Sequence, residues 1–238
     1  MQLIIHADDF GISESVSQCI AECFGRGWVT ETSLMVNMPY ADKAVSLARE
    51  KGFADRVGLH LNLSQGNPLT DAIKEFPYFC NDDGSFNKKF HHRFGSRFFL
   101  SFAECVAVGA EIKAQLDRFC AYGGLLPKLD SHHHVHTDWS IYQILEQMAL
   151  EHGFTLMRIS ATLHKVGPIT RFYKKLLNRR IACRFETTDH FDGFNPQLVT
   201  AVERGQKVEL MTHPMYSSRG EILDMKRDYR EIVEALHV

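Results

Sequence analysis

The chain lacks several features that would define its class. Its 238 residues contain no apolar run near the roughly 20 residues that span a bilayer. Its six scattered cysteines form no CxxC pair, and Met1 leads directly into a predicted strand, without a signal peptide. We therefore expect reduced thiols and a cytoplasmic location. Cys19 and Cys23 are four residues apart, and we interpret them as core-facing, although two metal ligands would have the same spacing.

Charge is also nearly balanced, with 27 lysines and arginines against 29 acidic residues and a net charge of −2. No segment is predicted to carry a basic stripe interleaved with aromatic residues, which argues against a nucleic-acid partner. With 45% hydrophobic and 24% charged residues, the length suits one sizeable core. We predict a single domain over residues 1–238.

Short apolar runs alternate with amphipathic helical patterns from end to end. The predicted strands are 3–7, 32–36, 57–63, 128–132, 156–159, 184–187 and 207–211. The predicted helices are 13–25, 41–51, 102–122, 140–152, 169–178, 196–203 and 221–236. Seven βα units in series indicate an α/β fold whose parallel sheet forms a barrel of about seven strands, distorted or incomplete. An open doubly wound sheet is the alternative.

The rhythm is interrupted by a long insertion at about 64–101, after the third predicted strand. Long loops in compact domains are usually lids or binding loops. The insertion has a phenylalanine-rich stretch, which we interpret equally as a satellite core, an oligomer contact or a substrate wall. Its members are Phe86, Phe90, Phe94, Phe98 and Phe99.

Two adjacent carboxylates, Asp8 and Asp9, follow the apolar run 3–5 in the segment His-Ala-Asp-Asp-Phe-Gly. Side chains alternate across a strand, so we predict that the strand ends here, as Gly11 also indicates. Paired carboxylates at such a junction favour a metal or proton-transfer site. Capping of the next helix explains one carboxylate at most.

Other polar residues occur at the carboxyl ends of the later predicted strands, where the active sites of parallel α/β proteins gather. They are His60, Asn62, Asp130, Arg158, Asp189, His190, Thr212 and His213. A single histidine in a strand is more often a satisfied core residue than a ligand. Their convergence on one rim therefore carries the prediction of a site.

The segment Asp130 to His136 contains four histidines within five residues. An extended backbone would place His132, His134 and His136 on one face and His133 on the other, whereas a helix would pair His132 with His136. Imidazole is the commonest transition-metal ligand, and two histidines with one carboxylate leave open positions at which water is activated.

Five segments together resemble the YdjC-like carbohydrate deacetylase family, which includes deacetylases of chitooligosaccharides and of the hopanoid pathway. They are HADDFG, VGLHLNL with the following GNPL, LDSHHHVH, LMR at 156–158 and LMTHP at 210–214. The resemblance spans nearly the whole chain. It implies a barrel related to the TIM fold, one divalent cation, and hydrolysis of the acetamide of an N-acetylated sugar.

The resemblance also implies roles for particular residues. Asp9, His60 and His132 would hold the cation, Asp8 would be the base, and His213 an acid or oxyanion stabiliser. Arg158 would orient Asp8 or bind substrate. The remaining polar residues of the rim are assigned to substrate binding or to support of the site: His6, Asn62, Asp130, His134, His136 and Asp189.

Three readings of the function remain open from the sequence. The first is a deacetylase using Zn²⁺ or Mg²⁺ on a free, oligomeric or glycolipid-linked sugar. The second is a barrel phosphoesterase, which would usually need two metals and more bridging carboxylates. The third is a non-catalytic sugar- or metal-binding protein, against which the presence of both Asp8 and His213 argues. A homo-oligomer, preferably a dimer, is also expected.

Overall fold

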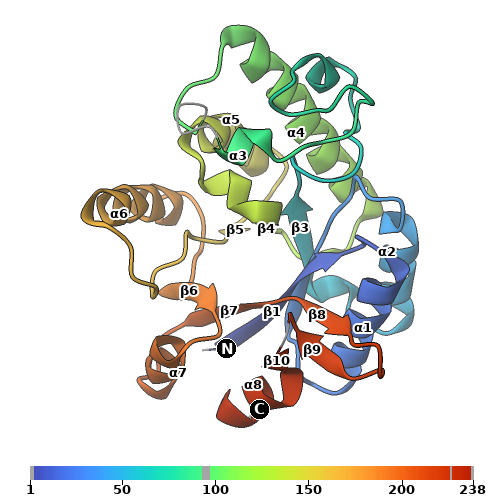
Figure 1. Ribbon diagram of the computed structural model, residues 1–238, viewed down its shortest axis with the longest axis vertical. Coiled ribbons are helices and arrows are strands. Elements are labelled where there is room, and N and C mark those ends of the chain that lie inside the picture. The colour runs from blue at the N-terminus through green and yellow to red at the C-terminus, as the bar shows by residue number, and fades with distance from the viewer. Residues whose placement is uncertain (1–2, 93–96, 226, 237–238) are drawn as a thin grey trace.

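The computed structural model describes residues 3–92, 97–225 and 227–236 (Figure 1). Seven strands form one parallel sheet with the order β5-β4-β3-β2-β1-β7-β6. They are β1 (Leu3–Phe10), β2 (Glu31–Leu34), β3 (Val57–Leu61), β4 (Lys128–Ser131), β5 (Leu156–Met157), β6 (His190–Gly193) and β7 (Val208–Thr212). The sheet curls into a half-barrel that is open between β5 and β6, and the predicted fold class is confirmed.

Helices connect the strands and cover the outer side of the curled sheet (Figure 1). They are α1 (Glu14–Gly25), α2 (Ala41–Glu50), α3 (Lys89–His92), α4 (Phe102–Tyr122), α5 (Trp139–Glu151), α6 (Pro168–Ala182), α7 (Pro196–Glu203) and α8 (Tyr229–Leu236). Short 3₁₀ turns occupy Ala54–Arg56, Ala72–Glu75 and His132–Thr137. Ser13 caps α1 by accepting from the backbone of Val16, so neither Asp8 nor Asp9 serves as that cap.

The predicted sixth strand, 184–187, is wrong. Only Glu186 in that segment bridges to a strand, at Leu156, and the paired strand β6 begins at His190. The segment has the alternating pattern of a strand, but its hydrogen bonds only tether the chain to β5 across the opening of the half-barrel. The barrel is therefore incomplete at this point.

The predicted helix over 221–236 is also wrong in its first half. A small antiparallel sheet is formed there by β8 (Pro214–Tyr216), β9 (Ile222–Asp224) and β10 (Arg227–Asp228), and only α8 remains helical. The Asp224 carboxylate accepts a hydrogen bond from the backbone of His213 at 2.8 Å. This contact joins the hairpin to the end of β7.

The insertion before α4 contributes both core and surface. Phe86 and Phe90 are buried in the core, and the Phe90 ring stacks on Phe79 at 4.9 Å. Phe99 is 83% exposed, whereas Phe94 lies outside the described residues. Part of the phenylalanine-rich stretch is therefore ordinary core.

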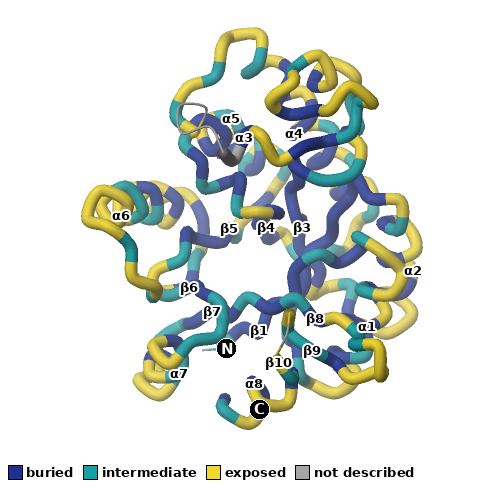
Figure 2. Tube along the Cα trace, in the orientation of Figure 1, coloured by how far each residue is buried: buried dark blue, intermediate teal, exposed yellow. Residues whose placement is uncertain are grey.

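One hydrophobic core lies between the sheet and its helices, shown by the buried trace in Figure 2. Cys19 and Cys23 are fully buried in it, which confirms their interpretation as core residues. Among the described residues, no helix combines the length and apolar character needed to cross a membrane.

Candidate active site

Asp8 and Asp9 reach the same cavity because β1 contains an irregularity. The pairing of β1 with β2 goes from Ala7–Thr32 to Phe10–Leu34, so β1 has one residue more than its partner over this stretch. Asp9 takes up the extra residue with a left-handed φ of 69°, a conformation that aspartate tolerates better than most residues. The sequence predicts that this strand ends before Asp8. That prediction is wrong, because the strand continues to Phe10.

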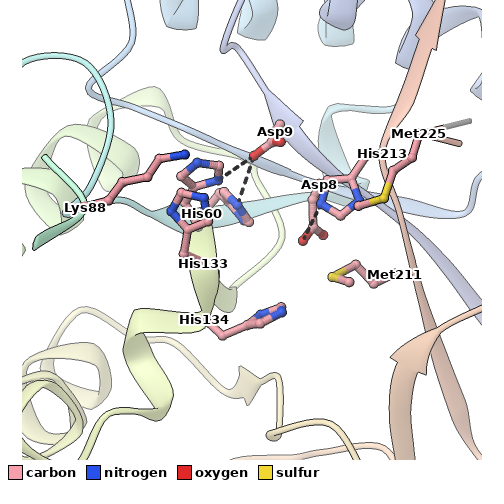
Figure 3. A pocket seen from close by; sticks show the side chains of 10 residues that line it. Asp8, Asp9, His60, Lys88, His133, His134, Met211, His213 and Met225 are labelled. Carbon is pink, nitrogen blue, oxygen red and sulfur yellow. Dashed lines mark ion pairs between the residues drawn. The ribbon is translucent and has the colours of Figure 1, made fainter. Parts of the chain in front are cut away.

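The ligand-type atoms of Asp9, His60 and His132 all lie within 4.8 Å of one another, and Figure 3 shows Asp9 and His60 pointing toward each other. Asp9 Oδ1 lies 2.8 Å from His132 Nδ1 and 3.3 Å from His60 Nε2. They come from the β1 irregularity, from β3 and from the turn after β4. Three residues that are distant in sequence are therefore brought together as predicted.

The donor atoms of this group fit a divalent cation. Asp9 Oδ1 and His60 Nε2 are buried and make no hydrogen bond, which is costly unless another partner satisfies them. The second ring nitrogen of each histidine is already held, His60 Nδ1 by Asp130 at 2.8 Å and His132 Nε2 by Gln65 at 2.9 Å. Such outer partners orient the ligand ring of a metal site.

Charge in this group favours binding a cation. Burial by itself would lower the pKa of His60, but Asp130 and Asp9 prevail and raise it to about 10. Burial acts against ionisation of Asp9, yet its close contacts with the His132 and His60 rings hold its pKa well below the usual range. The group therefore attracts positive charge, a proton or a metal ion.

Asp8 stands beside this group and is held by a buried arginine. Arg158 is 1% exposed and donates to both Asp8 oxygens, from Nη1 at 2.9 Å and Nη2 at 2.7 Å. Burial would raise the pKa of Asp8, but the guanidinium lowers it overall, so the carboxylate stays ionised. Arg158 is thus placed to orient Asp8 and lies beneath the cavity surface.

A buried polar network underlies both aspartates. Asp130 accepts from Ser33 at 3.0 Å and lies 2.6 Å from Arg158 Nη2. His6 Nε2 lies 3.0 Å from Ser33 Oγ and 3.2 Å from Asp130. The predicted supporting positions of His6 and Asp130 thus lie directly behind the site.

The sequence did not predict three further charges in this network. Lys128 lies 2.7 Å from Glu31 and 2.9 Å from Glu209, and Glu209 accepts from Arg158 at 2.6 Å. All three side chains emerge from strands. The signal that could have revealed Glu209 is a carboxylate between Val208 and Leu210 in an otherwise apolar run.

The histidine run is neither extended nor a regular helix, because its 3₁₀ turn is interrupted by a kink. His133 and His134 have left-handed φ values of 51° and 58°, which redirect successive rings. His133 therefore lines the cavity, with its ring 4.0 Å from that of His132, and does not face away. His136 points into the protein instead, where it bonds to Ser131 and to the Arg158 carbonyl.

A cavity of about 590 Å³ opens over this group, within the range of small-molecule sites. The polar residues that line it are Asp8, Asp9, His60, Lys88, His132, His133, His134 and His213 (Figure 3). His213 follows β7 and approaches Asp8 to 4.0 Å. Lys88 comes from the 64–101 insertion, which thereby contributes to the site.

Two predicted site residues lie elsewhere. Asn62 does not line the cavity, and its side chain instead bonds Asn37 and the backbone of Gln65, the residue that holds His132. Asp189 is exposed at the start of β6 and accepts from the Lys207 backbone, at the amino ends of the strands. Its predicted place on the rim is wrong because β6 begins at His190, so Asp189 precedes the strand instead of following it.

A carboxylate and two histidines beside a second carboxylate, at the carboxyl ends of a half-barrel, define a candidate metal-assisted hydrolytic site. The model of the family described as YdjC-like protein matches residues 2–235. The chain belongs to this family, which confirms the resemblance seen in the motifs.

Curated relatives carry a consistent name. A carbohydrate deacetylase of Geobacillus stearothermophilus is 32% identical, and the match covers 90% of this chain and 79% of the relative. A carbohydrate deacetylase of Clostridium beijerinckii is 34% identical, with 91% and 82% covered. The prediction of a hydrolase of this type is thus confirmed at the level of the family.

A solved structure shares the fold. It is a protein of Enterococcus faecalis V583 named for cellobiose-phosphate cleavage, with a TM-score of 0.73 and 22% sequence identity. The match covers 99% of this chain and 93% of the other. At this identity the likeness concerns the fold alone.

Proposed function

We propose that this chain hydrolyses the acetamide of an N-acetylated sugar, releasing acetate and a free amine, with one divalent cation held by Asp9, His60 and His132. The observation that carries the proposal is the pair of buried, unbonded donor atoms, Asp9 Oδ1 and His60 Nε2, beside the ionised Asp8 in one cavity. The names of the curated relatives support the same chemistry.

Two imidazoles and one carboxylate favour Zn²⁺ or another transition ion over Mg²⁺, which prefers oxygen ligands. When bound, such an ion polarises an amide oxygen and makes water a stronger nucleophile at neutral pH. Asp130 and Gln65 hold the two histidine rings in the orientation that this requires.

Asp8 is the proposed general base. Its carboxylate is kept ionised by Arg158 and lines the cavity beside Asp9, so it is ready to accept the proton of an attacking water. Both of its oxygens are fixed by the guanidinium, which holds the acceptor in one orientation. Arg158 is thus a positioning residue.

His213 is the proposed acid for the departing amine. Its ring lines the cavity on the other side of Asp8 from the three ligands, and its Nε2 lies 4.0 Å from Asp8 Oδ2 (Figure 3). His134 Nδ1 is buried at the cavity without a hydrogen-bond partner. We propose that this atom accepts a hydrogen bond from a substrate hydroxyl.

The geometry argues against a two-metal phosphoesterase. A second group of ligand-type residues exists in His6, Asp8 and Asp130, but all three are buried. Arg158 Nη2 already lies 2.7 Å from Asp8 and 2.6 Å from Asp130. This guanidinium occupies the position in which a second cation would bridge the carboxylates.

The test is hydrolysis with and without added metal. After treatment with a chelator, the protein would be incubated with N-acetylglucosamine oligomers or with bis(p-nitrophenyl) phosphate, each with Zn²⁺, Mg²⁺ or neither. We expect equal amounts of acetate and free amine, only with an added ion, and no phosphodiester cleavage. Phosphodiester cleavage without acetate release would favour the phosphoesterase, and metal binding without any turnover would favour a binding protein.

A further inference from the structure

Helix α6 has an unusual charge distribution for a chain with a net charge of −2. Residues 165–184 include no acidic residue, and the prediction that no segment carries a basic stripe with aromatics is wrong here. The basic residues are Lys165, Arg171, Lys174, Lys175, Arg179, Arg180 and Arg184. Within the described parts of the chain, Arg171, Lys175 and Arg179 have no ion-pair partner.

The outward face of α6 is apolar along its centre. Ile169, Phe172 and Leu176 are 84%, 65% and 53% exposed, although each is a residue type that is usually buried. At 100° per residue these three side chains fall within about 60° of one another, with Lys175 and Arg179 on one flank and Arg180 on the other. The buried Leu177 lies on a different face, toward the protein.

The location of α6 leaves this face open. Figure 1 shows the helix at the rim of the half-barrel, and Figure 2 shows the exposed trace along its outer side. Phe98 packs on Tyr173 of α6 at a ring distance of 5.5 Å, and the next residue, Phe99, is 83% exposed. The apolar surface therefore extends beyond the helix itself.

We propose that this outward face of α6, which we call the α6 face (Ile169, Phe172, Leu176, Lys175 and Arg179), binds an anionic lipid surface. A helix with an apolar stripe flanked by Lys and Arg lies in the headgroup region of a membrane, with its apolar side chains inserted and its cations on lipid phosphates. A single partner would thereby pair with the free cations and bury the exposed apolar side chains.

The other possible occupants fit this face less well. A second copy of the chain docking α6 against α6 would bring the same unpaired cations together, which is unfavourable. Nucleic acid would pair with the cations and stack on Phe172, but Ile169 and Leu176 would stay exposed to water. An acyl layer beneath anionic headgroups accommodates both kinds of side chain.

The same helix borders a second cavity, next to the candidate active site. Tyr173 and Lys174 line a cavity of about 370 Å³ together with His133, His134 and Met211, and these last three also line the active-site cavity. A docked α6 would hold this second cavity near the lipid surface. The inference concerns binding only and does not depend on the proposed function.

The experiment is co-sedimentation of the full chain with vesicles of phosphatidylcholine alone or mixed equally with phosphatidylglycerol. We expect binding to the mixed vesicles, weakened by added salt. Near an anionic surface each cation contributes roughly a five-fold change in the partition coefficient, so Lys175→Gln with Arg179→Gln should lower it by roughly twenty-five-fold. Phe172→Ser should weaken binding at every salt concentration.

Matched controls change the same chemistry elsewhere on the surface. Lys51→Gln with Arg204→Gln removes two exposed cations from other helix ends, and Val106→Ser removes an exposed apolar side chain from α4. These variants should bind as the unmodified chain does. All the substitutions are at exposed positions, and far-ultraviolet circular dichroism would confirm that each variant is folded.

Three results would overturn the inference. One is absence of binding to the mixed vesicles, and another is equal loss of binding in the α6 and control variants. The third is α6-dependent dimerisation in light scattering, or α6-dependent binding of single-stranded DNA, without any vesicle binding. Acetate release from a soluble oligosaccharide should be the same in the α6 variants, so failure of this inference is distinguishable from failure of the proposed function.

Discussion

At the scale of the residue, the adjacent aspartates differ in what already neutralises them. Asp8 is paired with a guanidinium on both oxygens, whereas Asp9 Oδ1 has only imidazole nitrogens within reach. An arginine never gives up its proton, so Asp8 is committed to one cation. The histidines can lose theirs, which leaves Asp9 free to share a metal with them.

This difference predicts opposite losses for two substitutions. Asp8→Asn should keep the metal and lower turnover by roughly 10²- to 10⁴-fold, the usual contribution of a general base. Asp9→Asn, like His60→Ala or His132→Ala, should lose bound metal first. Elemental analysis and acetate release, measured on the same samples, would check both. If Asp8→Asn lost the metal and Asp9→Asn kept it, the two roles would be exchanged.

A second prediction concerns His213, whose backbone is fixed by Asp224 while its ring faces the cavity. An amine leaving group needs a proton, but an activated phenolate does not. His213→Ala should therefore reduce hydrolysis of an acetamide much more than hydrolysis of an aryl acetate. Steady-state rates on the two substrates would decide. Equal losses would argue for oxyanion stabilisation or packing in place of the acid role.

Individual site residues could be predicted from the sequence where a polar side chain lies within one residue of the carboxyl end of a strand. Asp9, His60 and His132 are such residues, and the structure places them together. His133 was misjudged because its orientation depends on two left-handed backbone positions, which the types of the residues do not reveal. Asp189 was misjudged because its strand starts later than predicted.

At the scale of the element, the close approach of β3 and β4 positions His60, a ligand of the proposed metal site. A Cβ atom on Gly58 would lie 2.8 Å from the Lys128 carbonyl oxygen, a backbone atom that cannot move without shifting β4. His60 follows Gly58 by two residues on β3 and bonds Asp130 of β4. The glycine therefore allows the strand spacing on which the orientation of His60 depends.

Gly58→Ala should accordingly destabilise the protein by about 1–3 kcal/mol, the usual cost of overpacking, and weaken metal binding. Gly25→Ala is the matched control, because no atom lies within 4 Å of its Cβ position in α1. Alanine is the better helix former, so this control should be neutral or slightly stabilising. Urea unfolding and metal titration would measure both variants. Equal free energies of unfolding would contradict the close-packing argument.

The strands β1, β3 and β7, which the sequence located well, are buried segments that pair with another strand on each side. The two wrong elements depend on contacts with distant parts of the chain. Residues 184–187 alternate like a strand but only tether to Thr155 and Met157. The hairpin formed by β9 and β10 is anchored by a hydrogen bond from the His213 backbone to Asp224. The spacing of apolar residues along the sequence does not reveal such a contact.

At the scale of the whole molecule, buried charged side chains gather on the inner side of the half-barrel. Lys128, Glu31, Glu209 and Arg158 form a continuous chain of ion pairs beneath Asp8. Buried ion pairs seldom increase stability over apolar packing, but they fix orientation. We infer that the network keeps the two aspartates in place, at a cost that the apolar core offsets.

Protonation of His136 should make the stability of the whole molecule depend on pH. Burial lowers its pKa to about 4, against the raising effect of Asp130, and the neutral ring is held by Ser131 and the Arg158 carbonyl. The unfolded chain takes up this proton below about pH 6.5, whereas the folded protein does so only near pH 4. Between these values the unfolded state binds more protons, so stability falls as the pH falls.

From pH 7 to pH 4 this one residue should remove about 3 kcal/mol from the free energy of unfolding, at 1.36 kcal/mol per pKa unit. His136→Gln lacks the titrating ring, so it should be less stable than the unmodified chain at pH 7 and lose correspondingly less on acidification. Urea unfolding of both proteins across this range, in the presence of a chelator, would measure the difference. Parallel stability curves would show that His136 is not the group whose protonation is linked to unfolding.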